Sequence, residues 1–340
     1  MLQNLLSIFF LVLLFISIFQ ILEVSLTKDE ASFFLKEKYF LGKINGDFSQ
    51  INLPQRAFFK NQFCDFLFDG SLFCFQNNKV FISKDKKHFN LLGKIEGKNI
   101  LVKEMFLQNN FIYLLADDGK ADKILLSKDK GKSFQEKINF GEKNFHSLFV
   151  FPQNPNHLLL AKDDLIFESE NQGFSWKVKN KFSGRVEKIG KLENGIFVLV
   201  ESQGDFQILE SRDFGASFFK VFSTKDSGID FGIKEVFASG DSFYILFTNN
   251  QFGTLKEGRF YLFSPPLFEG EELTSFTLDQ ENGKIIYLGG KKGIYISLDE
   301  GGSWERFPLS FFERRLSKVK DLKSNPIFPQ EFLIKIESFI

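Results

Sequence analysis

The sequence of 340 residues predicts an all-β fold built from repeated units of four antiparallel strands. Three observations lead to this prediction. A turn motif, Ser-x-Asp-x-Gly-x-Ser-aromatic, recurs along the chain. Short apolar runs precede and follow each copy, and turn-forming residues separate these runs, as they do in strand-rich proteins. A motif that returns at a fixed period of about 20–50 residues is typical of repeat architectures.

The motif has four well-preserved copies and one degenerate copy. Their first serines lie at positions 83, 127, 169, 211 and 297, so neighbouring copies are 42 to 44 residues apart and the last step of 86 spans two periods. The copy at position 83 has lost its glycine, and the copy at position 169 has Asn in place of Asp. The defining residues of the preserved copies are Ser127, Asp129, Gly131 and Phe134; Ser169, Asn171, Gly173 and Trp176; Ser211, Asp213, Gly215 and Phe218; and Ser297, Asp299, Gly301 and Trp304.

We expect the motif to form the turn between two strands. Asp, Asn and Ser side chains bond to the backbone of their own turn, and Gly supplies the positive φ that a tight turn needs. The closing Trp or Phe can bury its ring against the turn. These residues therefore receive a structural role, and none is predicted to be catalytic.

Each repeat contains three apolar runs before the motif and one after it. In the repeat around Ser169 the runs are 147–150, 158–160 and 165–167, and in the last full repeat they are 275–278, 285–288 and 294–296. One further repeat lies between positions 211 and 297, with expected strands at 236–238, 243–247 and 259–263, and with Ser264-Pro265-Pro266 in the place of the motif. Residues 248–258 are then the longest loop between a second and a third strand.

The two ends of the chain are expected to share one unit. Residues 33–44 resemble a third and fourth strand without the motif, whereas 318–322 and 332–336 resemble a first and second strand that stop. Pairing these segments would close a ring and remove an exposed sheet edge. The count is then seven units, with six or eight as alternatives, in one domain over residues 32–340 that we expect to be monomeric.

The first residues form an apolar segment. Positions 5–22 carry no charge, and eighteen residues of helix span roughly 27 Å, close to the thickness of the hydrocarbon core of a bilayer. A cleaved signal peptide is the alternative, but no Lys or Arg precedes the segment and no small-x-small cleavage site follows it. We therefore predict a membrane anchor over residues 1–24. Flanking charge does not decide its orientation.

The composition is that of a globular protein, with 43% hydrophobic and 25% charged residues. Lys plus Arg and Asp plus Glu number 43 each, so net charge gives no reason to expect a nucleic-acid partner. We also predict no metal and no cofactor. The three histidines are scattered, and two cysteines ten residues apart make no zinc pattern.

Repeats of this kind resemble the Asp-box (BNR) repeats of β-propeller proteins, and the resemblance covers residues 32–340. That group includes sialidases, sortilin-type receptor domains, xyloglucan-cleaving hydrolases and photosystem II assembly factors of the Ycf48/HCF136 type. The resemblance implies a seven-bladed β-propeller of four-stranded antiparallel blades, with the motif between the third and fourth strands and away from the ligand-binding face. Length and layout are closest to the assembly factors, which implies a propeller outside the cytoplasm.

Few residues are suited to catalysis. Cys64 and Cys74 flank the turn at Asp69-Gly70; a two-residue loop leaves them diagonal and a three-residue loop sets them opposite one another, and we expect two free thiols. Sialidases bind a carboxylate with three arginines and carry Arg-Ile-Pro, but none of the seven arginines here lies in that motif. Acid pairs such as Glu201 with Asp205 would support glycoside hydrolysis if held about 5–9 Å apart, although ordinary turn residues are the preferred interpretation.

We therefore expect a non-enzymatic, protein-binding propeller on the periplasmic or extracellular side of the cytoplasmic membrane. It would act as an assembly, stability or scaffold factor for a membrane or envelope complex. A glycan-binding or sialidase-like glycoside hydrolase propeller is the alternative. Loops on a rigid scaffold tend to carry function, and the expected ligand-binding residues are Asn249, Asn250, Gln251, Phe252 and Lys256 with Asp117, Asp118, Asp163 and Asp164.

Overall fold

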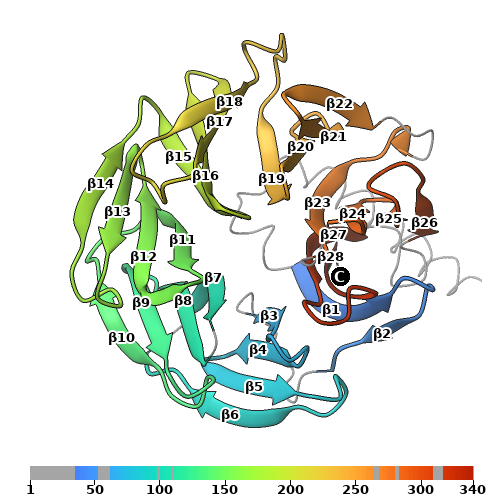
Figure 1. The fold of residues 1–340 in the computed structure, drawn as a ribbon. Helices are drawn as coiled ribbons and strands as arrows, with labels where there is room; N and C mark the ends of the chain where they lie inside the picture. Colours follow the sequence, from blue (N-terminus) through green and yellow to red (C-terminus); the bar gives the residue numbers. More distant parts are fainter. Residues whose placement is uncertain are drawn as a thin grey trace, which may run out of the picture.

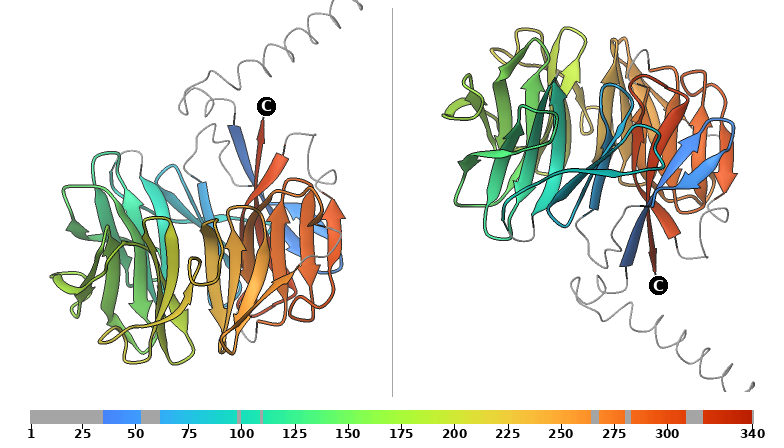
Figure 2. Two further views of the ribbon diagram at one scale, coloured as in Figure 1. Left: turned by 90° about the horizontal axis from the view of Figure 1, so that it is seen from above. Right: turned by 90° about the horizontal axis from the view of Figure 1, so that it is seen from below.

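The computed structural model describes residues 35–52, 62–97, 100–108, 110–263, 268–279, 283–308 and 317–339. Within these ranges the chain forms seven four-stranded antiparallel sheets, arranged as the blades of a ring around a central channel (Figures 1 and 2). The predicted fold class, an all-β seven-bladed propeller, is confirmed. No helix in the described ranges is long and apolar enough to cross a membrane, and the predicted anchor at residues 1–24 lies outside them.

Six blades are continuous in sequence. Blade 1 consists of β3 (Gln62–Phe66), β4 (Leu72–Gln76), β5 (Lys79–Ser83) and β6 (Asn90–Lys94). Blade 2 consists of β7 (Leu101–Gln108), β8 (Phe111–Asp117), β9 (Asp122–Ser127) and β10 (Gln135–Asn139). Blade 3 consists of β11 (Phe145–Phe151), β12 (Asn154–Lys162), β13 (Leu165–Ser169) and β14 (Lys177–Lys181).

The remaining continuous blades follow the same order from the inner to the outer strand. Blade 4 consists of β15 (Arg185–Leu192), β16 (Gly195–Ser202), β17 (Asp205–Ser211) and β18 (Phe219–Ser223). Blade 5 consists of β19 (Ile233–Ser239), β20 (Ser242–Phe247), β21 (Phe252–Lys256) and β22 (Arg259–Phe263). Blade 6 consists of β23 (Leu273–Leu278), β24 (Ile286–Gly290), β25 (Gly293–Ser297) and β26 (Glu305–Pro308).

Blade 7 joins the two ends of the described chain. It contains β27 (Ser317–Ser324), β28 (Glu331–Phe339), β1 (Leu35–Lys43) and β2 (Phe48–Gln50). β1 pairs with β28 along nine residue pairs, from Leu35 opposite Phe339 to Lys43 opposite Glu331. Residues 33–44 were expected to supply both outer strands, but they supply only the third. The fourth strand follows a tight turn at 44–47, where Lys43 N–H donates to the carbonyl of Asp47.

The core lies between neighbouring blades, and phenylalanine rings fill much of it. Ring centroids of Phe106 and Phe149 are 6.4 Å apart across blades 2 and 3, and those of Phe197 and Phe243 are 5.3 Å apart across blades 4 and 5. The buried Tyr113 hydroxyl donates to the carbonyl of Pro155 in the next blade at 2.7 Å. Edge-to-face aromatic packing therefore joins the blades side by side.

The four preserved motif copies all form the turn between the third and fourth strands of a blade. In blade 2 the buried Ser127 hydroxyl donates to Asp129 (2.8 Å) and accepts from the Gly131 N–H (2.7 Å). Asp129 also accepts from the N–H (2.9 Å) and hydroxyl (2.6 Å) of Ser133. Gly131 has a φ of 94°, which favours glycine. Equivalent bonds recur in blades 3, 4 and 6.

Blade 5 corrects one part of the sequence-based strand assignment. Residues 259–263 were expected to be the third strand, but they are the fourth, and the third is β21. A two-residue turn at Glu257 and Gly258, with φ of 52° and 72°, connects them. Positive φ at both positions identifies the hairpin turn whose twist matches the strands. Residues 248–258 are therefore two short turns with a strand between them and form no long loop.

The two cysteines form a disulfide, so the expectation of free thiols was wrong. Cys64 and Cys74 lie directly opposite one another on β3 and β4, with Cα atoms 4.2 Å apart. The connecting turn spans residues 67–71, and it is closed by a hydrogen bond from the N–H of Leu67 to the carbonyl of Ser71. A turn of odd length shifts the register by one residue relative to a two-residue hairpin, which places both side chains on the same face.

We predict that Ser127→Ala lowers the free energy of unfolding by about 1–3 kcal/mol, because the buried Gly131 N–H loses its acceptor. Ser133→Ala is the matched control in the same turn, since Ser133 is exposed, and it should cost less than about 1 kcal/mol. Urea unfolding of both variants measures the difference. Equal losses would show that the buried hydroxyl does not hold the turn.

Reducing the disulfide should lower the free energy of unfolding by about 2–3 kcal/mol, the loop entropy expected for a crosslink between residues ten positions apart. Urea unfolding with and without a reductant measures this loss. The variant with Cys64→Ala and Cys74→Ala is the control and should not respond to the reductant. Thiol labelling of both cysteines in the unreduced native protein would contradict the crosslink.

Candidate functional site

The ring has two faces that differ in the kind of loop they carry. Because the strands of a blade alternate in direction, the turns between the second and third strands share one face with the connections between blades, here called the connection face. The turns between the first and second strands share the other face with the Ser-x-Asp turns, here called the motif face. The described chain begins at Leu35 and ends at Phe339, and both lie at the connection face (Figure 2).

The predicted ligand-binding residues are divided between these faces. Seven of them lie in or directly beside turns at the connection face, in blades 2, 3 and 5. They are Asp117, which ends β8, and Asp118, Asp163, Asp164, Asn249, Asn250 and Gln251. Phe252 is not available to a ligand at this face, because its side chain is fully buried between blades 5 and 6. Lys256 is also misplaced. It ends β21 at the opposite face, where its Nζ lies 3.9 Å from Glu300. Both errors follow from reading β21 as loop.

The paired aspartates of blade 2 are bound within their own turn. Asp118 accepts from the N–H groups of Lys120 and Ala121, both at 2.9 Å, and pairs with Lys123 at 2.9 Å. These hydrogen bonds, led by that of Ala121, hold the pKa of Asp118 well below its usual range. Asp117 accepts from the Gly119 N–H at 2.7 Å and pairs with Lys143. Both carboxylates therefore serve the turn.

Three acids of the other pairs also bond through their carboxylates. Asp164 lies 3.4 Å from Lys181, whereas Asp163 contributes its backbone carbonyl, which accepts from the Val186 N–H. Glu201 accepts from the Gly204 N–H, whereas Asp205 accepts from the hydroxyls of Ser223 and Thr224. These are the bonds of turns and connections, as the preferred interpretation expected.

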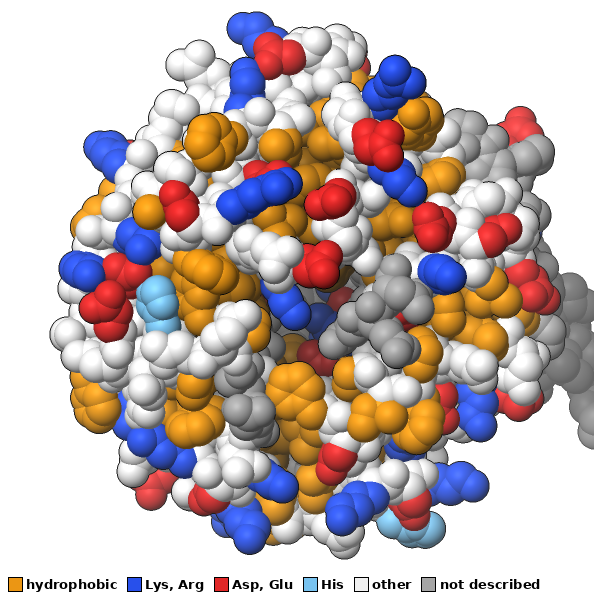
Figure 3. Space-filling view, in the orientation of Figure 1, with side chains coloured by type: hydrophobic (Ala, Val, Ile, Leu, Met, Phe, Trp, Pro, Cys, Tyr) orange, Lys and Arg blue, Asp and Glu red, His pale blue; other side chains and the backbone are white. Residues whose placement is uncertain are grey.

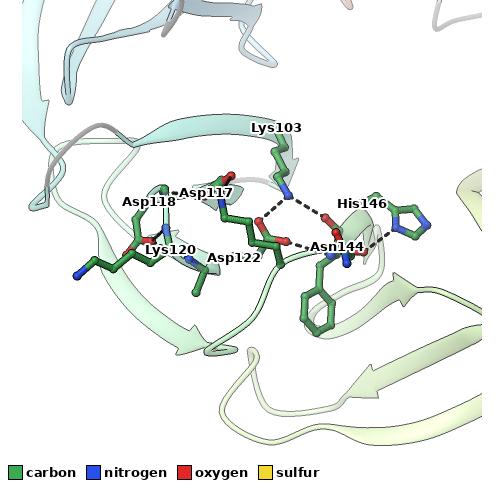
Figure 4. Close-up of polar contacts among 11 residues, drawn as sticks. Lys103, Asp117, Asp118, Lys120, Asp122, Asn144 and His146 are labelled. Carbon is green, nitrogen blue, oxygen red and sulfur yellow. Dashed lines mark hydrogen bonds and ion pairs between the residues drawn. The ribbon is translucent and has the colours of Figure 1, made fainter. Parts of the chain in front are cut away.

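A buried ion pair ties blade 2 to blade 3 beside this turn. Lys103 Nζ lies 2.5 Å from the fully buried Asp122 and donates to the carbonyl of Phe145 at 3.2 Å. The other carboxylate oxygen of Asp122 accepts from the Phe145 N–H at 3.0 Å (Figure 4). His146 follows, with its Nδ1 2.8 Å from the carbonyl of Asn144 and its Nε2 against the carbonyl of Val186 in blade 4.

A polar cavity of about 440 Å³ opens next to this ion pair, over blades 2, 3 and 4 on the connection face. Its lining residues are Lys103, Asn144, Phe145, His146, Asp163 and Arg185. Arg185 is 56% exposed at the start of β15 and pairs loosely with Glu187, so its guanidinium is available to a ligand. The charge of Lys103 is already matched by Asp122, so the exposed guanidinium of Arg185 is the group that favours an anionic or hydrogen-bond-accepting ligand.

The central channel is lined by charges that join the blades. In blades 2 to 7 the first strand carries a β-bulge, and the residue after the bulge reaches the next blade in four consecutive interfaces. The bonds are Leu148 N–H to Glu104 (2.7 Å), Ile189 N–H to Ser147 (3.0 Å), Lys188 to the Val236 carbonyl (2.8 Å) and Phe276 N–H to Glu235 (3.0 Å). Figure 3 shows charged and hydrophobic side chains around the channel opening.

Burial shifts the titration of these channel residues. It raises the pKa of Glu104 and of Glu235, and it lowers the pKa of Lys188. Burial also raises the pKa of Asp65, which lies on the first strand of blade 1, to about 6. The positive charge of Lys323 on β27 acts in the opposite direction and lowers this pKa. The hydrogen bonds across the interfaces indicate a structural role for this set, so perturbed pKa values here are not signs of catalysis.

Of the residues that line the cavity, sequence reasoning named Asp163 and missed the others. Lys103, His146 and Arg185 lie at or near the start of three different first strands, in sequence steps of 43 and 39 residues. A charged residue at the same place in successive apolar strands was the available signal. These residues come close together only because the ring places the starts of neighbouring first strands side by side.

No family model matches this sequence, and no curated protein matches it either. Several solved structures do match this chain in fold. YCF48 from Cyanidioschyzon merolae aligns with a TM-score of 0.63 at 14% identity, over 86% of this chain and 98% of that one. A structure of YCF48 bound to D1 peptide aligns with a TM-score of 0.61 at 10% identity, over 83% and 96%.

A glycoside hydrolase shares the architecture as well. The GH74 enzyme of Niastella koreensis aligns with a TM-score of 0.56 at 15% identity, over 76% of this chain and 48% of that one. This chain thus spans about half the length of that enzyme. At these identities the likeness defines the class of fold, a seven-bladed propeller, and leaves the activity to be argued from the site.

We predict that Asp65→Asn changes the pH dependence of stability. Since the folded pKa of about 6 lies above the ordinary value of 3.8, the folded state binds more protons between these pH values. The contribution of Asp65 is therefore fully present below pH 3.8 and is lost as pH rises through about 6. Urea unfolding from pH 4 to 7 should show the variant gaining stability relative to the wild type.

Asp69→Asn is the control, in the turn after the same strand. Burial acts to raise its pKa, but hydrogen bonds from Ser71 lower it below the ordinary value. The stability that ionised Asp69 contributes is therefore lost only as pH falls below the ordinary pKa of an aspartate. Between pH 4 and 7 the Asp69→Asn variant should gain no free energy of unfolding relative to the wild type. Parallel pH profiles for the two variants would contradict the assignment.

Proposed function

We propose that this protein is a non-enzymatic binding propeller, held to the cytoplasmic membrane by residues 1–24 with the ring on the extracytoplasmic side. It binds a segment of another protein and acts in the assembly or stability of a membrane or envelope complex. The observation that carries the proposal is the polar cavity lined by Lys103, His146, Asp163 and Arg185.

The cavity has features expected of a peptide-binding site. The Lys103–Asp122 pair and the His146 contacts fix its wall, so little ordering is needed when a ligand arrives. Exposed Arg185 offers a planar guanidinium that can bind a carboxylate through two hydrogen bonds. Phe145 is buried and holds the wall through its backbone bonds to Lys103 and Asp122.

The position of the chain start supports membrane attachment on this side. β1 begins at Leu35 on the connection face, so an anchor ending at residue 24 is joined to the ring there by a segment of about ten residues, at most about 35 Å long. The cavity would then face the membrane and the proteins within it.

The disulfide supports a location outside the cytoplasm. Disulfides persist in oxidising compartments and are rare where glutathione and thioredoxin keep thiols reduced. Both cysteines are buried where blade 1 packs against blade 7, so the crosslink serves the fold. The structural neighbour described as bound to D1 peptide supports peptide binding as a use of this architecture.

Glycoside hydrolysis is the competing function, and the acids argue against it. That reaction needs two carboxyl groups free to face a sugar at a set separation. Asp118 and Asp205 instead accept hydrogen bonds from their own turns and connections. Any turnover of a panel of glycosides by the full chain, abolished by Asp-to-Asn changes, would favour the enzyme.

Charge reversal at the cavity tests the proposal. Full-length protein carrying Arg185→Glu is purified from its native membranes, and co-purifying proteins are quantified by mass spectrometry. We expect the bound partner to fall by about tenfold or more, as for loss of a central arginine contact. Arg212→Glu is the control, since Arg212 is also exposed (74%) and pairs with a nearby Glu, but it lies on the motif face.

The proposal fails if the partner remains bound to the Arg185→Glu variant, or if both variants lose it equally. It also fails if wild-type protein enriches no protein over the control purification. Retention of the disulfide and of the unfolding midpoint in both variants shows that the comparison concerns binding.

A further inference from the structure

An exposed apolar cluster lies on the motif face, opposite the cavity. Phe68, Ile327 and Phe328 are 49%, 48% and 52% exposed. Phe68 belongs to the β3–β4 turn of blade 1, and the other two belong to the β27–β28 turn of blade 7. Hydrophobic side chains gather below the channel opening in Figure 3, where these blades meet. Contiguous apolar groups on a soluble surface mark interaction sites.

Both turns are held by hydrogen bonds from backbone N–H groups to a side-chain oxygen of the same turn. Asn325 is fully buried, and its Oδ1 accepts from the N–H groups of Ile327 (3.0 Å) and Phe328 (3.2 Å). In the other turn Asp69 accepts from the N–H of Ser71 at 3.0 Å. The backbone bonds hold the apolar side chains outward, so a ligand that binds them pays little conformational entropy.

The two turns are in contact. A Cβ placed on Gly70 would lie 3.2 Å from the Asn325 side chain and 3.4 Å from the Phe328 ring. The turns that carry the three apolar side chains therefore lie side by side at the junction of blades 1 and 7.

Lysines of the degenerate motif copy border this surface. Lys86 pairs with Glu331, and its Nζ lies 5.1 Å from the centroid of the Phe328 ring. Lys84 and Lys87 are exposed, and Lys84 interacts electrostatically with Asp69 beside Phe68. Asp85 is occupied by its own turn, where it accepts from the Ser83 hydroxyl and the His88 N–H.

A groove of about 380 Å³ separates these lysines from blade 7. Its lining includes Lys43, Lys84, Lys86 and Lys87 together with Asp47, Asp85 and Glu331. Glu331 is paired with Lys86, Asp85 is bound in its turn, and Asp47 accepts from the Asn45 side chain. Four lysines stand against three carboxylates in this lining, so the groove carries a small excess of positive charge.

We propose that this surface binds an acidic segment of a second protein, one that places a bulky apolar side chain on Phe68, Ile327 and Phe328 while its carboxylates meet Lys84 and Lys87. Apolar anchors in the centre with charges at the rim are the usual arrangement of a protein interface. The surface faces away from the chain start, so with the proposed anchor it points away from the membrane. The protein would then link two partners, one on each face.

The experiment uses full-length protein in zwitterionic nanodiscs and a library of random linear peptides displayed on phage. Selected peptides should carry Phe, Leu or Trp next to two or more acidic residues. Binding of a selected synthetic peptide, measured by fluorescence anisotropy, should weaken about tenfold or more in Phe328→Ser and in Lys87→Glu. Phe219→Ser (66% exposed) and Lys130→Glu, both exposed elsewhere on the ring, are the matched controls.

Four outcomes would overturn the proposal. Selection could yield no acidic and apolar consensus, the selected peptide could bind the variants as well as the wild type, or the controls could weaken binding equally. Sedimentation with phosphatidylglycerol vesicles that is lost in Phe328→Ser would assign the surface to lipid and also overturn it. Arg185→Glu should leave peptide binding unchanged, so this result is independent of the function proposed for the cavity.

Discussion

The pairing of β1 with β28 is the constraint on which the structure depends. A ring of blades is stable only when its last blade meets its first, because an open ring would leave two apolar blade faces in water. Here nine residue pairs between segments from the two ends of the chain close blade 7. Each blade then finds a neighbour on both sides, and buried rings such as Phe197 and Tyr113 pack across the interfaces.

Around the channel, a repeated backbone irregularity fixes how neighbouring blades dock. A bulge in the first strand of each of blades 2 to 5 turns one polar side chain toward the next blade, where it meets a backbone group. Buried carboxyl and ammonium groups are costly unless they are hydrogen-bonded. Glu104 and Lys188 meet this requirement across an interface, so they orient the blades while they are buried.

This rigid ring presents two chemically different faces. The connection face carries the cavity, whose cations Lys103 and Arg185 come from different blades. The motif face carries an apolar cluster bordered by lysines, at the junction where the chain ends are joined. The degenerate motif copy in blade 1 contributes to that second surface. The motif copy that has lost its glycine is therefore the one whose lysines border the proposed binding surface.

The sequence by itself determined the period, the strand order within most blades, the turn position of the motif and the shared last blade. These are local patterns of apolar runs and turn residues, and local patterns can be recognised without coordinates.

Sequence-based prediction failed where the length or position of a turn decides which way a side chain faces. The β3–β4 turn set the cysteine register, and the turn at Glu257 and Gly258 made Phe252 a core residue. The candidate turn residues do lie on the connection face, and their part in ligand binding stays a prediction. Only the tertiary structure brought Lys103, His146 and Arg185 together, because closure of the ring, rather than any local propensity, sets which strand starts are neighbours.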